Sequence, residues 1–213
     1  MRNDAYESIA PAEVRGHPIP RHGVGRYEGG RAFAVATGIG RPRGWSIARK
    51  HVLRGLGEGL ASAASARAGE RLRVAVTAAR DALIEACNAL VEREVPDAGL
   101  VVLLLSSGSA HVAVVGDGRV YLQRRGHPQR LTPRDQRAEG LIEGEVVMGE
   151  TVLDPNDLLL IGSASAFSEV AIRRVGGVLQ SDANASPAAL ASLLTEPARK
   201  AGVGAAALAI RIA

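Results

Sequence analysis

The sequence has little of three things: cysteine, aromatic side chains and long apolar runs. Cys87 is the only cysteine, so no disulfide can form within the chain. Its place in a stretch of apolar residues at helical spacing indicates a buried thiol rather than a nucleophile. Aromatic residues make up 3% of the chain, which leaves almost nothing to stack on nucleic-acid bases. Hydrophobic residues still make up 46%, so Ala, Val and Leu must fill the core.

No apolar run approaches the ~20 residues that a helix needs to cross a bilayer. The longest, Leu100–Leu105, has the length of a strand. The N-terminal stretch Met1–Glu7 has no apolar segment of the kind that a secretory signal requires. We therefore expect a cytoplasmic protein that has no membrane partner.

The excess of one charge sign is also small. The chain has 26 Lys and Arg against 22 Asp and Glu, a net charge of +4. Four arginines lie close together in the sequence. Nucleic-acid binding through them is a hypothesis that rests on charge alone. A solvated basic surface explains them equally well, so we do not favour a nucleic-acid partner. The four are Arg124, Arg125, Arg130 and Arg134.

At 213 residues the chain is long enough for one domain with a substantial core. Residues 1–23, rich in Pro, His, Arg and Gly, predict an extended or partly ordered arm with an edge strand at its end, and residues 24–213 predict a single domain. Apolar residues at three- and four-residue steps predict helices over Pro42–Leu60, Glu70–Glu94, Ala166–Val175 and Ser186–Lys200. Short apolar runs bounded by turn residues predict strands over Arg31–Ala36, Leu100–Leu105, Ala110–Val115, Val120–Leu122, Glu145–Val152, Leu158–Ile161 and Ala205–Ile212.

One segment carries a more specific pattern. Residues Val112–Leu122 contain a strand, the turn Gly116-Asp117-Gly118 and a second strand, and Leu131-Thr132-Pro133-Arg134-Asp135 follows. This segment resembles the centre of the type 2C protein phosphatases, the Mg/Mn-dependent Ser/Thr phosphatases, where a strand runs into Gly-Asp-Ser-Arg and a later block reads Leu-Thr-x-Asp-His. Other blocks occur in the family's order, so the resemblance covers roughly residues 24–213.

The resemblance implies a fold of class α+β. We expect a four-layer α/β/β/α sandwich of two antiparallel sheets flanked by helices. Family members usually insert several dozen residues after the Leu-Thr-x-Asp-His block, as a flap that covers the metal site. Here only Gln136–Leu153 intervenes, so we expect a reduced flap.

The resemblance also implies a site for two metal ions, but the sequence departs from the family at the ligands. Thr37, Ser163 and Val203 stand where the family has aspartates, and Gly38 keeps the position of a carbonyl ligand. Mg²⁺ and Mn²⁺ bind mainly through carboxylates, whereas a hydroxyl is a weak ligand and a valine side chain is none. Asp117 keeps a family position, although a turn between strands also favours Asp for its own geometry. We expect no catalytic residue and no bound metal at this site.

These departures predict a pseudophosphatase, a catalytically inactive phosphatase-like domain that acts as a protein-interaction or regulatory module in signalling. A kinase, a phosphoprotein or a larger bacterial assembly would suit it as a partner. The degenerate site itself offers the candidate contact surface. Its candidate binding residues are Thr37, Gly38, Ser163, Ser165 and Gly204.

One alternative remains open. A divergent Mg- or Mn-dependent protein Ser/Thr phosphatase could hold its metal weakly in a rearranged site, with ligands from Asp117, Asp135, glutamates of the arm or a second chain. The five histidines do not help this alternative, because they are scattered without a pair at the helical spacing of metal ligands. Packing or surface roles are favoured for them.

Overall fold

The structure of the protein is a computed structural model that describes residues 3–90, 95–125, 127–134 and 139–213. Its helices are α1 (Pro42–Ser62), α2 (Ala68–Asn88), α3 (Glu169–Ser181) and α4 (Pro187–Lys200), with the short 3-10 helix η1 (Ala164–Phe167) before α3. Its strands are β1 (Asp4–Val14), β2 (His17–Ile19), β3 (His22–Tyr27), β4 (Ala32–Ile39), β5 (Asp97–Ser106), β6 (Ser109–Val115), β7 (Arg119–Arg124), β8 (His127–Arg130), β9 (Val147–Val152), β10 (Leu158–Gly162) and β11 (Val203–Arg211).

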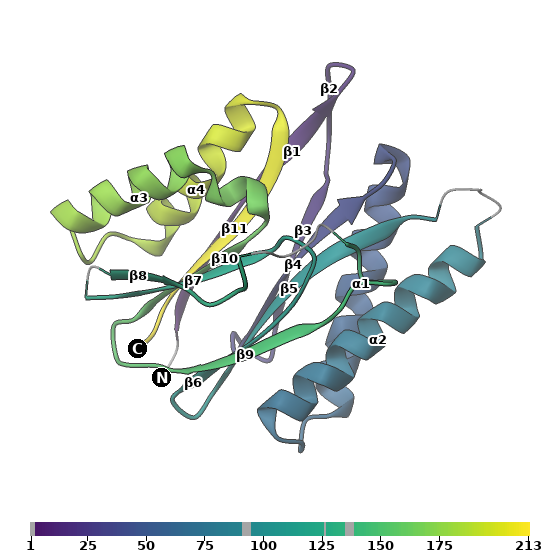
Figure 1. The fold of residues 1–213 in the computed structure, drawn as a ribbon, viewed down its shortest axis with the longest axis horizontal. Coiled ribbons are helices and arrows are strands. Elements are labelled where there is room, and N and C mark those ends of the chain that lie inside the picture. Colours follow the sequence, from purple (N-terminus) through teal and green to yellow (C-terminus); the bar gives the residue numbers. More distant parts are fainter. Residues whose placement is uncertain (1–2, 91–94, 126, 135–138) are drawn as a thin grey trace.

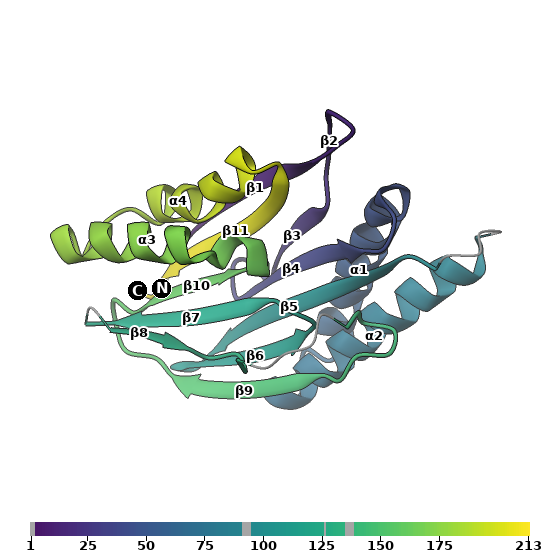
Figure 2. The ribbon, with the colours of Figure 1, turned by 45° about the horizontal axis from the view of Figure 1, so that its top comes forward.

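The strands form two sheets whose paired neighbours are all antiparallel. One sheet has the order β2-β1-β11-β10-β7-β8, and the other has the order β3-β4-β5-β6-β9. Helices α1 and α2 cover the outer face of the five-stranded sheet, and α3 and α4 cover that of the six-stranded sheet (Figures 1 and 2). This is the four-layer α/β/β/α sandwich that the resemblance implied.

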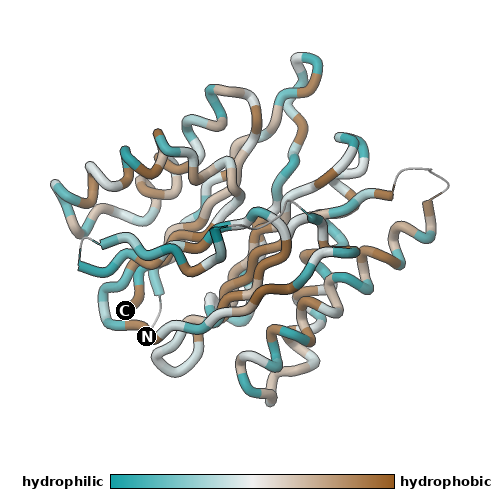
Figure 3. Tube along the Cα trace, in the orientation of Figure 1, coloured by the Kyte–Doolittle hydropathy of each residue, from teal (hydrophilic) through white to brown (hydrophobic). Residues whose placement is uncertain are grey.

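Strand β5 shows why the chain folds into layers. Successive side chains of a strand point to opposite faces of a sheet. In β5 the side chains of Leu100, Val102 and Leu104 pack with α1 and α2, while Val101, Leu103 and Leu105 pack against the other sheet. Because both faces are covered, the strand is apolar throughout and does not alternate. The central strands accordingly form the brown band of apolar residues in Figure 3.

Helices α1 and α2 pack closely because α1 has glycine on its contact face. A Cβ added at Gly55 would lie 2.5 Å from the Ala78 carbonyl oxygen, and one at Gly59 would lie 2.6 Å from the Ala75 Cα. Glycine lowers helix propensity by about 1 kcal/mol relative to alanine. Here that cost is offset by an approach between two helices that no other residue permits.

The first strand corrects one expectation. Residues 1–23 were expected to form an arm, but β1 pairs with β11 from Asp4↔Arg211 to Ala12↔Val203. It lies inside the six-stranded sheet, with β2 on its other side. The alternating exposure of β1 reflects a sheet strand with one face on α4, which the scattered Pro and His of this segment had obscured.

Element boundaries also differ elsewhere, most clearly in α3, β8 and α2. The predicted helix Ala166–Val175 is in fact η1 followed by α3, and Ser168 caps α3 by accepting a hydrogen bond from the Ala171 N–H. Strand β8 was not predicted. Helix α2 ends at Asn88, and the residues Val91–Glu94 of its predicted extension lie outside the described part of the chain.

The connection expected as a reduced flap is short and partly anchored. Arg80 of α2 donates through Nε to the Leu141 carbonyl at 2.6 Å and through Nη2 to the Gly144 carbonyl at 2.8 Å. The Leu141 side chain is fully buried among core residues of the five-stranded sheet. Its backbone N–H also donates to the Ala98 carbonyl at the start of β5.

Among the described residues, no helix has the length and apolar character needed to span a bilayer.

Candidate functional site

The candidate residues lie at strand ends of the two sheets, and the backbone of Gly204 in one sheet acts on His22 in the other. Thr37 pairs with His22 of β3 and with Gly99 of β5. Ser163 follows β10 and bonds through its backbone N–H to the Ala206 carbonyl of β11, two residues beyond Gly204. Strand ends from both sheets therefore carry the positions that the resemblance assigns to metal ligands.

Thr37 is bonded to a histidine. Its hydroxyl lies 3.0 Å from His22 Nδ1, and both side chains are buried. Burial, with a smaller contribution from the charge on Arg21, lowers the pKa of His22 from 6.5 to about 4, although the backbone of Gly204 acts in the opposite direction. The ring is therefore neutral near pH 7. Its Nε2 has no hydrogen-bond partner among the described residues.

The Gly38 carbonyl accepts a hydrogen bond from a positively charged side chain, that of Arg21. The Arg21 Nε donates to the Gly38 carbonyl oxygen at 3.1 Å, and the Gly38 N–H donates to the Arg21 carbonyl at 2.8 Å. The guanidinium also lies over the Trp45 ring, 5.4 Å from its centroid, and the indole N–H donates to the Gly40 carbonyl. A stacked, hydrogen-bonded guanidinium is held in place, so the positive charge is a fixed part of this end of the molecule.

Ser163 is satisfied within the fold. Its side chain is 1% exposed, lies 3.0 Å from the Ser165 hydroxyl and accepts from the Ala206 N–H at 3.2 Å. The hydroxyl therefore joins β10 to β11. A group this enclosed serves packing, and only Ser165 of the pair is half-exposed.

Val203 and Gly204 begin β11 in different environments. The Val203 side chain is 47% exposed. Gly204 is buried with a φ of +71°, and a Cβ added there would lie 2.8 Å from the Ala12 backbone nitrogen. The close contact with β1 and the left-handed backbone both require glycine here. Gly204 is thus a structural requirement of the β1–β11 pairing.

Asp117 lies in the turn between β6 and β7. Within the described part of the chain its carboxylate has no hydrogen bond or ion pair. The neighbouring Arg119 instead donates through Nη1 to the Phe167 carbonyl of η1 at 2.9 Å, while its buried Nε finds no partner among the described residues. The turn geometry, with Gly116 at a φ of +85°, accounts for Asp117 without a ligand role.

These residues do not fit a pair of divalent ions. The positions at issue carry two hydroxyls already bonded to the protein and one exposed valine, and the remaining carbonyl accepts from a guanidinium. Two closely spaced divalent ions need bridging negative charge, and none is present at these positions. Across the described ranges, no group of three or more His, Cys, Asp or Glu side chains is placed to hold a metal. Asp135, which the alternative hypothesis of a metal-dependent phosphatase names as a ligand, lies outside the described residues.

Sequence reasoning missed the two residues that define this site chemically, Arg21 and His22. Both were included in the arm, and the histidine was assigned a packing or surface role. Their relevance comes from strand register, because His22 pairs with Thr37 and Arg21 directly precedes it. No sequence motif marks that pairing.

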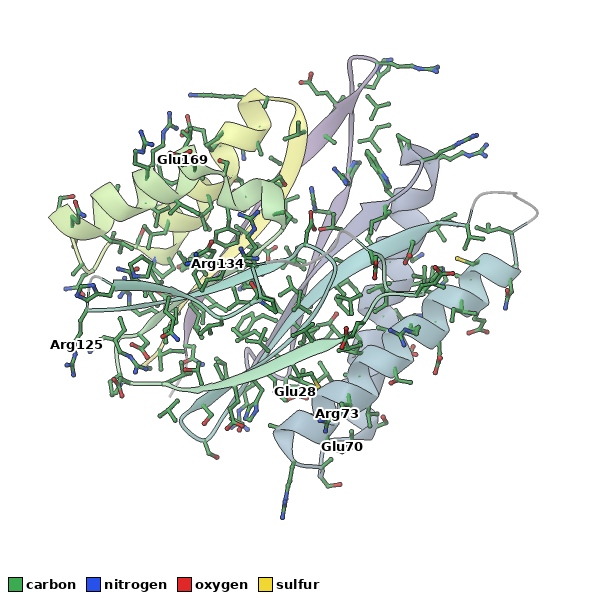
Figure 4. The ribbon with its side chains drawn as sticks, in the orientation of Figure 1. Glu28, Glu70, Arg73, Arg125, Arg134 and Glu169 are labelled. Atoms are coloured by element: carbon green, nitrogen blue, oxygen red, sulfur yellow. The ribbon has the colours of Figure 1, made fainter. Side chains whose placement is uncertain are left out.

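Three of the four basic residues that suggested nucleic-acid binding, Arg124, Arg125 and Arg130, lie on the β7–β8 hairpin. Arg124 forms ion pairs with Asp154 and Asp157, at 3.2 and 2.6 Å. Figure 4 shows Arg125 at the edge of the molecule and Arg134 near its middle, well apart. Part of the charge on this hairpin is thus neutralised by the two aspartates.

The stability of the protein should depend on the protonation of His22. Its pKa falls from 6.5 to about 4 on folding, so the unfolded chain binds the proton more tightly. The contribution of His22 to the free energy of unfolding is therefore fully present above pH 6.5. It is lost as the pH falls toward 4, by roughly 3 kcal/mol in total. Urea unfolding at stepped pH measures the loss. In His22→Asn this component should disappear, and an unchanged slope in that variant would contradict the assignment.

The fold is that of the type 2C Ser/Thr protein phosphatases. No protein-family model and no curated protein matches the sequence. Among solved structures, the chain is similar to the serine/threonine phosphatase PstP/Ppp of Mycobacterium tuberculosis, with 20% identity, a TM-score of 0.80 and coverage of 99% of this chain and 98% of that one. A structure of the PstP catalytic domain, also at 20% identity and a TM-score of 0.80, holds two manganese ions and is covered to 99%, as is this chain.

Two further structures have the same fold. PppA of Pseudomonas aeruginosa, described as a key regulatory component of T6SS, is 18% identical with a TM-score of 0.74, covering 99% of this chain and 98% of that one. The serine/threonine phosphatase of S. agalactiae is 15% identical with a TM-score of 0.76, covering 98% of this chain and 100% of that one. Identities this low establish the architecture alone.

Proposed function

We propose that this chain is a pseudophosphatase, a domain with the type 2C fold that binds a partner protein and does not hydrolyse phosphate. The observation that carries the proposal is the Arg21 guanidinium on the Gly38 carbonyl. A carbonyl that already accepts from a cation of the protein is a poor ligand for a second cation, because like charges a few ångströms apart repel strongly at low dielectric.

The chemistry of the missing carboxylates supports the same proposal. In a metal-dependent phosphatase the ions lower the pKa of a bound water and so supply the hydroxide that attacks phosphorus. At the corresponding positions here, Thr37 and Ser163 offer hydroxyls whose hydrogen bonds serve the fold. Neutral His22 could act as a base toward the Thr37 hydroxyl, but both side chains are buried, so a phosphorylated segment cannot reach this pair.

The charge at this end of the molecule favours a partner that is acidic or phosphorylated. Arg21 lies on the Gly38 carbonyl, next to the Thr37 position where the family has a carboxylate, so a negative group meets attraction in place of repulsion. A phosphoprotein or a kinase would meet this requirement. A larger bacterial assembly is a third candidate partner, and the description of PppA as a regulatory component of T6SS supports it by analogy. The proposal places the protein in the cytoplasm.

A divergent metal-dependent phosphatase is the second candidate. The structural neighbours favour it, because they are described as Ser/Thr phosphatases and one holds two manganese ions. It requires ligands outside the expected positions, and Asp117 is the one carboxylate that keeps a family position and has no described partner. The two candidates therefore differ in whether Asp117 binds metal.

We expect neither Mn²⁺ binding nor phosphate hydrolysis. Calorimetric titration with millimolar Mn²⁺ should give no heat beyond dilution, and turnover of an aryl phosphate or a phosphopeptide should equal the buffer blank. Asp117→Ala serves as the matched control and should behave as the parent does. If the protein hydrolyses either substrate in Mn²⁺ buffer and Asp117→Ala abolishes the hydrolysis, the second candidate, a divergent metal-dependent phosphatase, replaces this proposal.

A further inference from the structure

A cavity lies on the other side of the six-stranded sheet from its partner sheet, beneath helix α3. Its volume is about 160 Å³, and it is bounded by β7, β8 and β10 on one side and by η1, α3 and α4 on the other, with the exposed residues Pro128 and Gln180 at its open side. None of the candidate residues of the degenerate site lines it. Whatever occupies it is therefore independent of the function proposed above.

One turn of α3 contributes a glycine to the cavity wall. Residues three and four positions apart share a helix face, so Ile172, Gly176 and Leu179 point the same way. Ile172 and Leu179 wall the cavity, whereas Gly176 between them contributes no atoms beyond its backbone. A Cβ added at Gly176 would meet nothing within 4 Å. A Cβ at Gly177 would also meet nothing within 4 Å, but of the two glycines only Gly176 lines the cavity, so a larger residue there has room to extend into it.

An aromatic pair forms one wall of the cavity. Tyr121 and Phe167 lie with ring centroids 5.0 Å apart and planes tilted by 34°. The chain has only six aromatic residues, three Tyr, two Phe and one Trp, so two of the six are used here. The hydrogen bond from Arg119 to the Phe167 carbonyl holds η1, and with it the ring, against the sheet. Offset aromatic walls of this kind favour a third ring over an aliphatic group.

Polar side chains stand at the same cavity. Gln123 of β7 and Gln180 of α3 line it together with Tyr121, and none of the three side chains has a hydrogen bond to a described residue. The rest of the lining is mostly apolar, from residues such as Leu160 and Leu194. A small-molecule site has this composition, an apolar interior with a few polar groups that orient the ligand.

We propose that this cavity binds a compact aromatic ligand, a single six-membered ring that carries one hydrogen-bonding substituent. The size sets the limit, because an apolar cavity of roughly 150 Å³ is known to accept benzene. The aromatic wall accounts for the preference for a planar ring. The amides of Gln123 and Gln180, which can both donate and accept, would receive the substituent.

Phenol is the probe for the first test, and cyclohexanol is its matched aliphatic control. Titrations followed by protein NMR should show phenol binding that saturates in the millimolar range, with nuclear Overhauser contacts to the methyl groups of Ile172 and Leu179. The millimolar range is expected because a small ligand has few atoms with which to offset the loss of its own freedom. Cyclohexanol should bind about tenfold more weakly, because it has no ring face to pack against Tyr121 and Phe167. Equal binding of the two, or contacts at other methyl groups, would overturn the proposal.

Two leucine substitutions on α3 provide the second test. Gly176→Leu places a side chain at the cavity and should weaken phenol binding by at least about tenfold, since the space is filled. Gly177→Leu adds the same side chain at the exposed neighbour, outside the cavity lining, and should leave binding within about twofold of the parent. Circular dichroism confirms that both variants are folded.

A third variant guards against a fold change in Gly176→Leu. Tyr121→Leu keeps an apolar wall but removes the ring, so the preference of phenol over cyclohexanol should narrow to about twofold or less. Phenol affinity that survives both Gly176→Leu and Tyr121→Leu would show that the ligand binds elsewhere. The Mn²⁺ and hydrolysis experiments respond to neither substitution, so failure here and failure of the proposed function are distinguishable.

Discussion

Ser163→Asp should lower the free energy of unfolding by about 3–5 kcal/mol in metal-free buffer. The side chain is 1% exposed, and its present neighbours are the Ser165 hydroxyl and the backbone of Ala206. A carboxylate there would be buried without a cationic partner, and an unpaired buried charge is among the most costly changes to a protein interior. Urea unfolding followed by circular dichroism measures the loss.

Two comparisons isolate the charge from the change in shape. Ser163→Asn introduces a neutral group of the same size, so it should cost less than half as much as Ser163→Asp. Thr37→Asp should also cost less, because His22 lies 3.0 Å from the Thr37 hydroxyl and can gain a proton to pair with a carboxylate. Unchanged stability in the Thr37→Asp, Ser163→Asp double variant would show that the side chains at these two positions are solvated and contribute nothing to packing.

Leu141→Ala should lower the free energy of unfolding by about 3–4 kcal/mol, as large-to-small changes in a closed core do. Leu141 is fully buried, and it is the main apolar anchor of the short connection between β8 and β9 within the described residues. Its backbone is held on both sides, by the Ala98 carbonyl and by Arg80. The surroundings therefore have little freedom to close over the lost side chain.

Ile142→Ala is the matched control for this prediction. Ile142 is the next residue in the same connection but is only partly buried, so its truncation should cost less than half as much. Equal losses in the two variants, or a loss below about 1 kcal/mol in Leu141→Ala, would contradict the view that Leu141 anchors the connection.

Much of the fold could be predicted from local patterns. Pro42 at the start of α1, the cap at Ser186 and the Gly116-Asp117-Gly118 turn each mark an element boundary that the structure confirms. Strand β1 could not be predicted in the same way. Its partner in the sheet lies at the far end of the chain, in β11, and a pairing over that distance leaves no local periodicity strong enough to distinguish a strand from an arm.

The candidate site was only half visible in the sequence. Thr37, Gly38 and Ser163 follow from the resemblance, because they occupy positions next to recognisable strands. Arg21 and His22 do not, since their place beside Thr37 and Gly38 depends on the register of β3 against β4. The pKa of His22 is equally invisible in the sequence, because burial produces it. The sequence motifs show which carboxylates are missing from the site, whereas only the structure shows that Arg21 and His22 now lie there.

The pairing of β1 with β11 has a consequence for the order of folding. The five-stranded sheet uses strands within residues 22–152, and α1 and α2 fall in the same interval, so this half of the molecule closes through comparatively short loops. The six-stranded sheet cannot close until β11 inserts between β1 and β10, which joins Asp4 to Arg211. Loop closure costs more as the chain between two contacts lengthens, and folding slows as contacts become less local. We therefore expect the five-stranded half to form first and the six-stranded sheet, with α3 and α4, to form after β11 pairs with β1.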